Sequence, residues 1–247
     1  MSSRPGIQLS DPAAGDSKRD KSRLCSLCCV RSRSICGALD LMDLPEFERI
    51  RRHVHFASNE ALFTVGQPAG SVYNLTAGVA RMYKLLPDGR RQVIGFALPG
   101  DFLGTTAVDR YSFSTDAVVA VAACRIPIDA FSHFTGRNPK LLRRINEFAS
   151  RDLMLAHDQM LLLGRRTAEE KVAAFVIGWR DRLARIGDSR KTILLPMSRQ
   201  DIADYLGLTI ETVSRTLTRF EREKMLVIVI GGIRLLDTRR AEALAAA

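Results

Sequence analysis

The chain has 247 residues, of which 46 % are apolar, and its 37 basic and 27 acidic side chains give a formal net charge of +10. This length suits two domains, and the basic balance favours a polyanionic partner. The longest apolar block, residues 117–124, is far shorter than the roughly 20 residues of a membrane-spanning helix. No signal peptide is recognisable, so we expect a cytoplasmic protein without a membrane partner.

A group of cysteines follows a leader, residues 1–24, whose Ser, Pro, Gly, Asp and Lys residues show no apolar period. Such a composition predicts a flexible segment. Cys25, Cys28 and Cys36 then form the pattern C-x2-C-x7-C, and Cys29 stands beside the second of them. Because a reducing compartment does not favour disulfides, clustered thiols need another explanation, such as a metal site.

A short acidic and apolar helix is predicted at residues 43–51, and β-type runs follow from 53 to about 128. Turn residues rich in Gly, Pro and Asp separate these runs, which favours a small antiparallel barrel or jelly roll. Cys124 lies near the end of the last run. The predicted strands are residues 61–65, 72–75, 79–85, 92–98 and 117–126.

A long helix is predicted to begin at Pro139 and to run to about Leu163. One of its apolar stripes has the seven-residue spacing of a coiled-coil seam, which favours a parallel homodimer. The seam residues are Leu142, Ala149, Leu153, Ala156, Met160 and Leu163. A helix buried on both sides within one subunit is the alternative. The neighbouring stripe, expected to cover the β-domain, is Leu141, Ile145, Phe148, Leu155 and Leu162.

The stretch 198–220 has the pattern of a helix-turn-helix. Ser198 and Asp201 stand at capping-box spacing, and Gly207 supplies the backbone freedom of a sharp turn. A second helix beginning at Thr209 would bury three residues, Val213, Leu217 and Phe220. Its outward side would carry Glu211, Ser214 and Arg215.

Arg215 is the residue expected to recognise a base, because its planar fork matches the O6 and N7 acceptors of guanine. A plain helical hairpin with a solvated face is the simpler alternative for two helices alone. The flanking sequence favours a winged helix-turn-helix. A helix is predicted at residues 167–186, a strand at 193–195, and a hairpin of 226–230 and 233–236 around Gly231–Gly232.

The predicted fold is therefore α+β, with four parts in chain order. The flexible leader is residues 1–24, and a β-barrel sensor domain with its cysteine segment is 25–136. A dimerisation helix at 137–164 connects it to a winged helix-turn-helix domain at 165–247.

This order of parts resembles the CRP/FNR family of bacterial transcription regulators. Members that bind cyclic nucleotides have a Gly-Glu-Leu turn and an Arg-Ser or Arg-Thr phosphate clasp. Here the turn is Gly-Asp-Phe-Leu-Gly at residues 100–104, and the clasp region at 112–115 has no arginine. Arg110 lies nearby, but its neighbours do not match. We therefore expect no cyclic nucleotide, since its phosphate would lack a charge-assisted partner.

The cysteines resemble those of the FNR branch, and most closely its FnrN/FixK-like subgroup. Cys25, Cys28, Cys36 and Cys124 occupy the matching places. The resemblance implies that these four hold a [4Fe–4S] cluster, for which four thiolates are the usual ligands. It further implies an oxygen-responsive activator of low-oxygen genes, which binds DNA as a homodimer while the cluster is intact and contacts RNA polymerase.

The E-x-x-S-R signature of the family is matched by Glu211, Ser214 and Arg215. This match implies a two-fold operator with TTGAT-like half-sites. Relatives often carry an acidic residue in the dimer seam where this chain has Ala156, so we expect the protein without its cluster to dimerise more readily than a typical relative.

Other interpretations remain open at this level. Four thiolates can hold zinc or act as redox-sensitive thiols in a regulator of the same fold. A lone cysteine such as Cys124 is often an ordinary core residue. An iron–sulfur redox carrier would not need the helix-turn-helix. No nucleophile, base and orienting group form a recognisable motif, so an enzyme is not expected.

Overall fold

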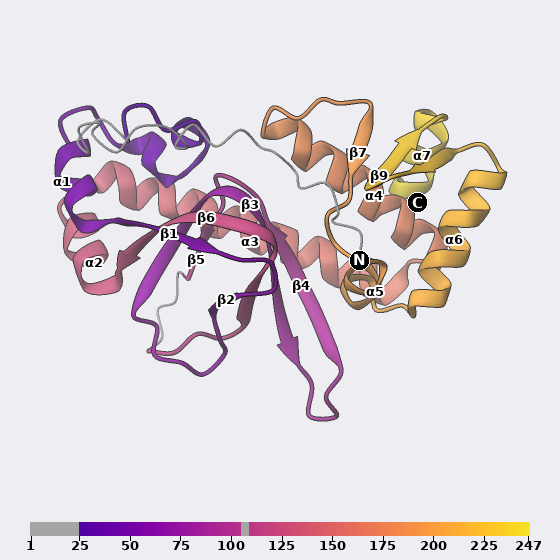
Figure 1. Ribbon diagram of the computed structural model, residues 1–247, viewed down its shortest axis with the longest axis horizontal. Helices are drawn as coiled ribbons and strands as arrows, with labels where there is room; N and C mark the ends of the chain where they lie inside the picture. The colour runs from indigo at the N-terminus through magenta and orange to yellow at the C-terminus, as the bar shows by residue number, and fades with distance from the viewer. Residues whose placement is uncertain (1–24, 105–108) are drawn as a thin grey trace. The chain divides into compact units, whose positions relative to one another are not determined.

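The computed structural model describes residues 25–104 and 109–247, and the leader predicted at 1–24 lies outside them. The described chain forms two compact units (Figure 1). One comprises residues 25–84 and 95–152, and the other comprises 85–94 and 153–247. Among the described residues, no helix has the length and apolar character needed to span a membrane.

The cysteine segment, residues 25–43 before the first helix, is held in place by a polar cap and an apolar cluster. It contains the short 3-10 helices η2 (Arg31–Arg33) and η3 (Ile35–Ala38), and the helix α1 (Leu44–Ile50) follows. Ile35 and Phe47 are fully buried, in a cluster that also holds Cys25 and Cys36. The helix predicted at residues 43–51 is confirmed, with Asp43 at its N-cap.

The β-domain is a six-stranded sheet in which β1, β6, β3 and β4 lie side by side, while β2 pairs with β6 and β5 with β3. Aromatic side chains fill its core, where Phe63 stacks on Tyr111 with ring centroids 4.1 Å apart. The strands are β1 (Arg52–Phe56), β2 (Ala61–Phe63), β3 (Ser71–Leu85), β4 (Arg91–Ala97), β5 (Phe102–Leu103) and β6 (Ser114–Pro127).

One strand prediction was wrong: residues 72–75 and 79–85 belong to the single strand β3. Gly78, which the sequence suggested as a turn, has φ +83° inside this strand. A Cβ there would lie 2.1 Å from the carbonyl oxygen of Ala120 on β6. The pairing with β6 shifts register around Gly78. Glycine therefore permits a bulge that bends the strand without ending it.

Two helices follow the sheet. The helix α2 (Ile128–Gly136), which the sequence analysis did not predict, buries Phe131 and Phe134. The helix α3 (Pro139–Arg165) is 27 residues long and places Leu141 and Phe148 in the cluster around the cysteine segment. Leu155 was expected on the same buried stripe, but it is 46 % exposed because α3 leaves this cluster after Phe148.

The C-terminal unit is a winged helix-turn-helix with an added helix. Its elements are α4 (Ala168–Arg185), β7 (Thr192–Leu194), α5 (Arg199–Leu206), α6 (Ile210–Arg222), β8 (Leu226–Val229), β9 (Gly232–Leu235) and α7 (Thr238–Ala246). The strand order is β7-β9-β8. The capping box of Ser198 and Asp201 is confirmed. The helix α7 was not predicted, and Glu242 on it forms an ion pair with Arg180 of α4 at 2.8 Å.

The wing turn is one residue earlier than predicted. Val229 pairs with Gly232, so the turn is Ile230–Gly231 and Gly232 belongs to β9. A Cβ on Gly232 would lie 2.3 Å from the carbonyl oxygen of Ile193. Gly232 is therefore required for close strand packing, and Gly231, with φ +75°, supplies the turn conformation.

The turn between the two helices of the helix-turn-helix gives a first prediction. Gly207 ends α5 with φ 61° and ψ 39°, and a Cβ there would lie 3.2 Å from Cδ2 of Leu163. Gly207→Ala should lower the free energy of unfolding by about 1–2 kcal/mol, because a side chain disfavours this left-handed backbone. Denaturant unfolding measures the change. In the control, Gly178→Ala on the exposed side of α4, the same methyl group meets open space and should stabilise by up to about 1 kcal/mol.

Candidate metal centre and nucleic-acid interface

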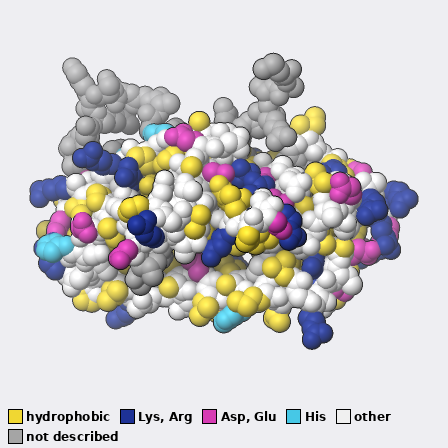
Figure 2. Space-filling model, turned by 90° about the horizontal axis from the view of Figure 1, so that it is seen from below, with side chains coloured by type: hydrophobic (Ala, Val, Ile, Leu, Met, Phe, Trp, Pro, Cys, Tyr) yellow, Lys and Arg dark blue, Asp and Glu magenta, His cyan; other side chains and the backbone are white. Residues whose placement is uncertain are grey.

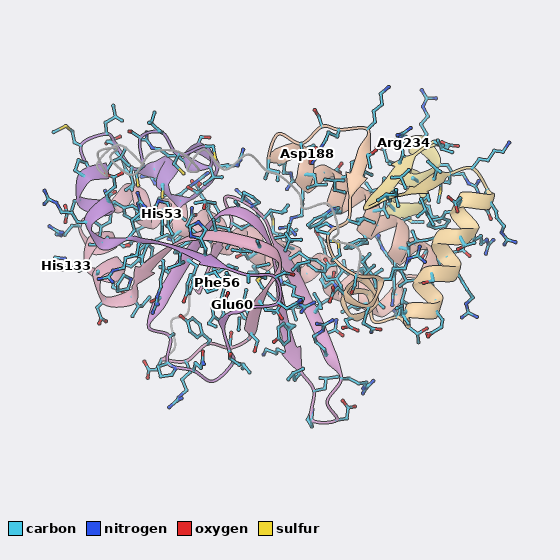
Figure 3. The ribbon with its side chains drawn as sticks, viewed as in Figure 1. His53, Phe56, Glu60, His133, Asp188 and Arg234 are labelled. Carbon is cyan, nitrogen blue, oxygen red and sulfur yellow. The ribbon has the colours of Figure 1, made fainter. Side chains whose placement is uncertain are left out.

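The register of the sheet places Cys124 at a defined position. Cys124 on β6 lies opposite His53 on β1 and Asn74 on β3. Directly paired residues in antiparallel strands project to the same face, and the His53 Nδ1 atom is 3.9 Å from Cys124 Sγ. His53 is labelled on β1 in Figure 3. Cys124 is buried, so its thiol is available to neighbouring segments of the protein rather than to solvent.

The other three predicted ligands come from the segment before α1. Cys25 and Cys36 are buried, and Cys28 is partly buried, whereas Cys29 is exposed. The backbone N–H of Cys25 donates to Glu48 Oε1 at 2.6 Å. The different burial of the two adjacent cysteines agrees with the spacing argument that selects Cys28 rather than Cys29.

Five of the six pairs among the four predicted ligands interact electrostatically. The thiol of Cys36 interacts with those of Cys25, Cys28 and Cys124. Cys25 also interacts with Cys124, and Cys124 with Cys28. In the described part of the chain, no three His, Cys, Asp or Glu side chains are gathered so as to hold a metal ion. The thiols therefore form a group without converging on a single point.

Burial controls the protonation of these thiols. It raises the pKa of Cys25 to about 12, against the opposing effect of Arg51, and it raises the pKa of Cys36 to about 12. Burial also raises the pKa of Cys124. Without a bound metal, these three thiols are therefore neutral at physiological pH. Metal ligation by them must release protons.

Arg51 is a buried residue of this site that the sequence analysis missed. Its Nε–H donates to Cys25 Sγ at 2.9 Å, and Nη1 lies 3.9 Å from Cys124 Sγ. Its Nη2 is 3.5 Å from Glu48 Oε1. Residues 51 and 53 are two apart, so the extended backbone that turns His53 toward Cys124 also directs Arg51 to that face. Finding this arrangement required the strand register, which the sequence alone did not supply.

The helix α6 presents the residues expected to contact DNA. Glu211 and Arg215 are exposed and Ser214 is partly buried, while Val213 and Leu217 face the core as predicted. The backbone N–H of Glu211 and the side chain of Thr209 at the helix start lower the pKa of Glu211. Its carboxylate is therefore an ionised acceptor near neutral pH, suited to the amino group of cytosine.

A second arginine missed from the sequence stabilises the first helix of this motif. Arg91, in the part of the hairpin that belongs to the C-terminal unit, contacts Asp201 at 2.6 Å and Asp204 at 2.8 Å. Gln92 Nε2 donates to the backbone carbonyl of Asp204 at 2.6 Å. Asp201 also accepts from the Ser198 N–H at 2.9 Å. This cap and ion pair fix α5 from two sides.

The six residues of the predicted dimer seam are mostly uncovered in the single chain. The exposed members are Leu142, Ala149, Leu153, Ala156 and Met160. Leu163 differs because it is partly buried near Gly207.

The basic charge of the protein is spread over its surface: in Figure 2, Lys and Arg side chains lie among acidic and hydrophobic ones over the visible face.

The β-domain, the long helix and the winged helix-turn-helix with its exposed α6 define a DNA-binding transcription regulator. Residues 195–226 match the family described as "Bacterial regulatory proteins, crp family", and residues 53–138 match the "Cyclic nucleotide-binding domain". The chain belongs to the CRP/FNR family of transcription regulators, as its relatives also show, and it is not an enzyme.

Among the relatives is the transcriptional activatory protein AadR of Rhodopseudomonas palustris, 60 % identical over 220 residues, which are 89 % of this chain and 92 % of AadR. The nitrogen fixation regulation protein FixK of Bradyrhizobium diazoefficiens is 56 % identical over 90 % of this chain and 94 % of its own length. The structure of FixK2 from Bradyrhizobium japonicum has a TM-score of 0.75 and 35 % identity, covering 80 % of this chain and 98 % of FixK2.

Proposed function

We propose that this regulator is an oxygen-responsive activator of low-oxygen genes and that Cys25, Cys28, Cys36 and Cys124 hold a [4Fe–4S] cluster. The observation that carries the proposal is the grouping of thiols from two distant segments: Arg51 contacts Cys25 Sγ at 2.9 Å and Cys124 Sγ at 3.9 Å, and Cys36 lies in the same buried cluster as Cys25. Both Cys36 and Cys124 also interact electrostatically with Cys28. Relatives named as transcriptional activators, AadR and FnrL of Cereibacter sphaeroides, support the activator role.

The donor set fits an iron–sulfur cluster. Four thiolates are the usual ligands of a [4Fe–4S] cluster, and each iron takes one of them. Sulfurs around a single zinc ion would converge to about 4 Å from one another, whereas the described side chains form no group that could hold an ion. When bound, the cluster would supply an oxygen-sensitive link between the cysteine segment and β6.

The apolar cluster suggests how the state of this link reaches the DNA-binding unit. Ile35 and Leu39 of the cysteine segment pack in the same cluster as Leu141 and Phe148 of α3. Release of the segment would uncover this part of α3 and disfavour the paired helices. Closer to the DNA, Gln159 Nε2 on α3 donates to the backbone carbonyl of Tyr205 on α5 at 2.7 Å. The same helix thus contacts both the sensor cluster and the helix-turn-helix.

DNA recognition would use two copies of the chain. Two α6 helices held one turn of DNA apart would enter successive major grooves of a two-fold site with TTGAT-like half-sites. In each half-site, Arg215 would donate to a guanine and Glu211 would accept from a cytosine. RNA polymerase would be the partner of the bound dimer.

Purification of the full chain without oxygen tests the cluster directly. We expect about four iron and four sulfide per chain and a brown protein, because iron–sulfur charge transfer absorbs visible light, and we expect the colour to bleach in air together with loss of operator binding. A colourless protein with one zinc per chain, or a metal-free protein whose DNA binding follows thiol oxidation, would replace the cluster proposal with the corresponding alternative.

The seam position Ala156 gives a prediction about dimerisation. Ala156→Asp should weaken the dimer of the metal-free protein at least about tenfold, or about 1.4 kcal/mol, because two like-charged carboxylates would face each other across the seam. Sedimentation velocity of the metal-free chain at micromolar concentration measures the change. Ser150→Asp is the matched control, since Ser150 is exposed on α3 outside the seam. If the unaltered metal-free chain sediments only as a monomer, the expectation about Ala156 is wrong.

A further inference from the structure

Arg51 is a cation buried at the junction between α1 and β1. It is the C-cap residue of α1, and its extended backbone, with φ −97° and ψ 156°, leads directly into β1. Only 5 % of its side chain is exposed. A buried guanidinium is costly unless negative charge and hydrogen-bond acceptors surround it, so its contacts indicate what the position is built for.

Glu48 satisfies this cation only partly. Its Oε1 is 3.5 Å from Arg51 Nη2, but the same oxygen also accepts from the Cys25 N–H at 2.6 Å. Its Oε2 is buried and has no hydrogen-bond partner among the described residues. The pair therefore lacks the two parallel bonds of a self-sufficient arginine–carboxylate pair. Glu48 instead aligns both Arg51 and the backbone of Cys25.

The remaining donors of Arg51 face sulfur. Nε donates to Cys25 Sγ at 2.9 Å, and Nη1 lies 3.9 Å from Cys124 Sγ. One rigid planar group thus connects a thiol of the N-terminal segment to a thiol of β6. A neutral thiol is a weak acceptor, so a buried cation aimed at two of them is poorly matched. The match becomes good when both sulfurs carry negative charge, as metal-ligating thiolates do.

We propose that Arg51 is a positioning residue of the cysteine centre, which holds the ligands Cys25 and Cys124 together and donates to their sulfurs when iron is bound. This inference rests on the cluster proposed above, and it concerns a residue that is not one of the four cysteine ligands. Hydrogen bonds to the sulfurs and net charge near an iron–sulfur centre set its reduction potential, and groups that orient metal ligands commonly change metal affinity 10–100-fold. Arg51 supplies both effects with one side chain.

The test compares Arg51→Gln with Arg52→Gln in the full chain loaded with iron and sulfide without oxygen. Arg52 is the adjacent, exposed arginine, so the control loses the same charge without losing the sulfur contacts. We expect the chelator concentration that removes half of the iron to fall about 10–100-fold for Arg51→Gln. We also expect its reduction potential to become more negative, and both values to stay unchanged for Arg52→Gln. Arg51→Lys, which keeps the charge but not the fork, should be intermediate.

A second measurement uses the reduced, metal-free chain and does not depend on iron. Amide hydrogen exchange across residues 25–39 should be faster in Arg51→Gln than in Arg52→Gln, because the connection from α1 to Cys25 and Cys124 is lost. Equal iron retention, potential and exchange in the two variants would overturn the role of Arg51 and leave the cluster intact. If the unaltered chain takes up no iron, the proposed function itself fails, and the exchange comparison then decides separately whether Arg51 positions the two thiols.

Discussion

Cys124→Ser should lower the affinity of the anaerobically loaded protein for iron by more than about 100-fold. Loss of a metal ligand should exceed the 10–100-fold effect of losing a residue that only orients a ligand. The hydroxyl is a poor substitute because it ionises far less readily than a thiol, and position 124 is buried between β1 and β3. Loss of this ligand would also remove the proposed link through the cluster between the sheet and the cysteine segment. Iron and sulfide quantitation, followed by operator binding without oxygen, measures both consequences.

Cys29→Ser is the matched control for this prediction. Cys29 is exposed and adjacent to Cys28 in the sequence, so its replacement should leave iron content and operator binding unchanged. A protein in which Cys29→Ser lost the iron and Cys28→Ser kept it would show that the ligand set had been assigned to the wrong member of the pair. Retention of a full complement of iron by Cys124→Ser would mean that the sheet contributes no ligand.

Arg215→Ala should cost about 1–3 kcal/mol in binding to the cognate operator, a factor of roughly 5–150, and should relax discrimination at a single G·C pair. Arg215 is exposed on α6, and in the proposed complex its guanidinium donates to both acceptors of guanine. Titration of the cognate site, of sites changed one base pair at a time, and of random DNA at one fixed salt concentration separates the two effects.

Arg222→Ala serves as the control for charge alone. Arg222 is exposed at the end of the same helix α6 but lies outside the E-x-x-S-R signature. Its removal should weaken cognate and random DNA alike, if at all, and should leave base discrimination unchanged. An equal loss on cognate and random DNA for Arg215→Ala would instead identify Arg215 as a phosphate contact.

The features that the sequence predicted well are those set by local rules. The capping box of Ser198 and Asp201, the Gly207 turn and the buried face of α6 each follow from spacing within a few residues. The grouping of the four cysteines depended on the resemblance to a family, because nothing local connects Cys124 with Cys25. The structure adds the pairing of Cys124 with His53, which explains how a residue so late in the β-domain can reach the N-terminal segment.

The features that the sequence did not predict depend on distant partners. Ala77–Gly78 looks like a turn until β6 is placed beside it, where the close approach of Ala120 makes it a bulge within β3. In the sequence Arg51 resembles a surface charge, and only the strand register shows that it contacts the Sγ atom of Cys25. Leu155 fits an apolar stripe by its spacing, yet the cluster that covers the stripe ends one heptad earlier.

The ion pairs of Arg91 have an electrostatic consequence for how the protein approaches a polyanion. In a helix-turn-helix, the first helix crosses the phosphate backbone, and here that helix carries Asp201 and Asp204. Arg91 compensates these two carboxylates with one guanidinium. Arg91, although remote in sequence from the helix-turn-helix, thus lowers the electrostatic repulsion between DNA phosphates and α5. This effect is the same for any DNA sequence. Arg91 therefore contributes to the general attraction for DNA that precedes recognition of an operator.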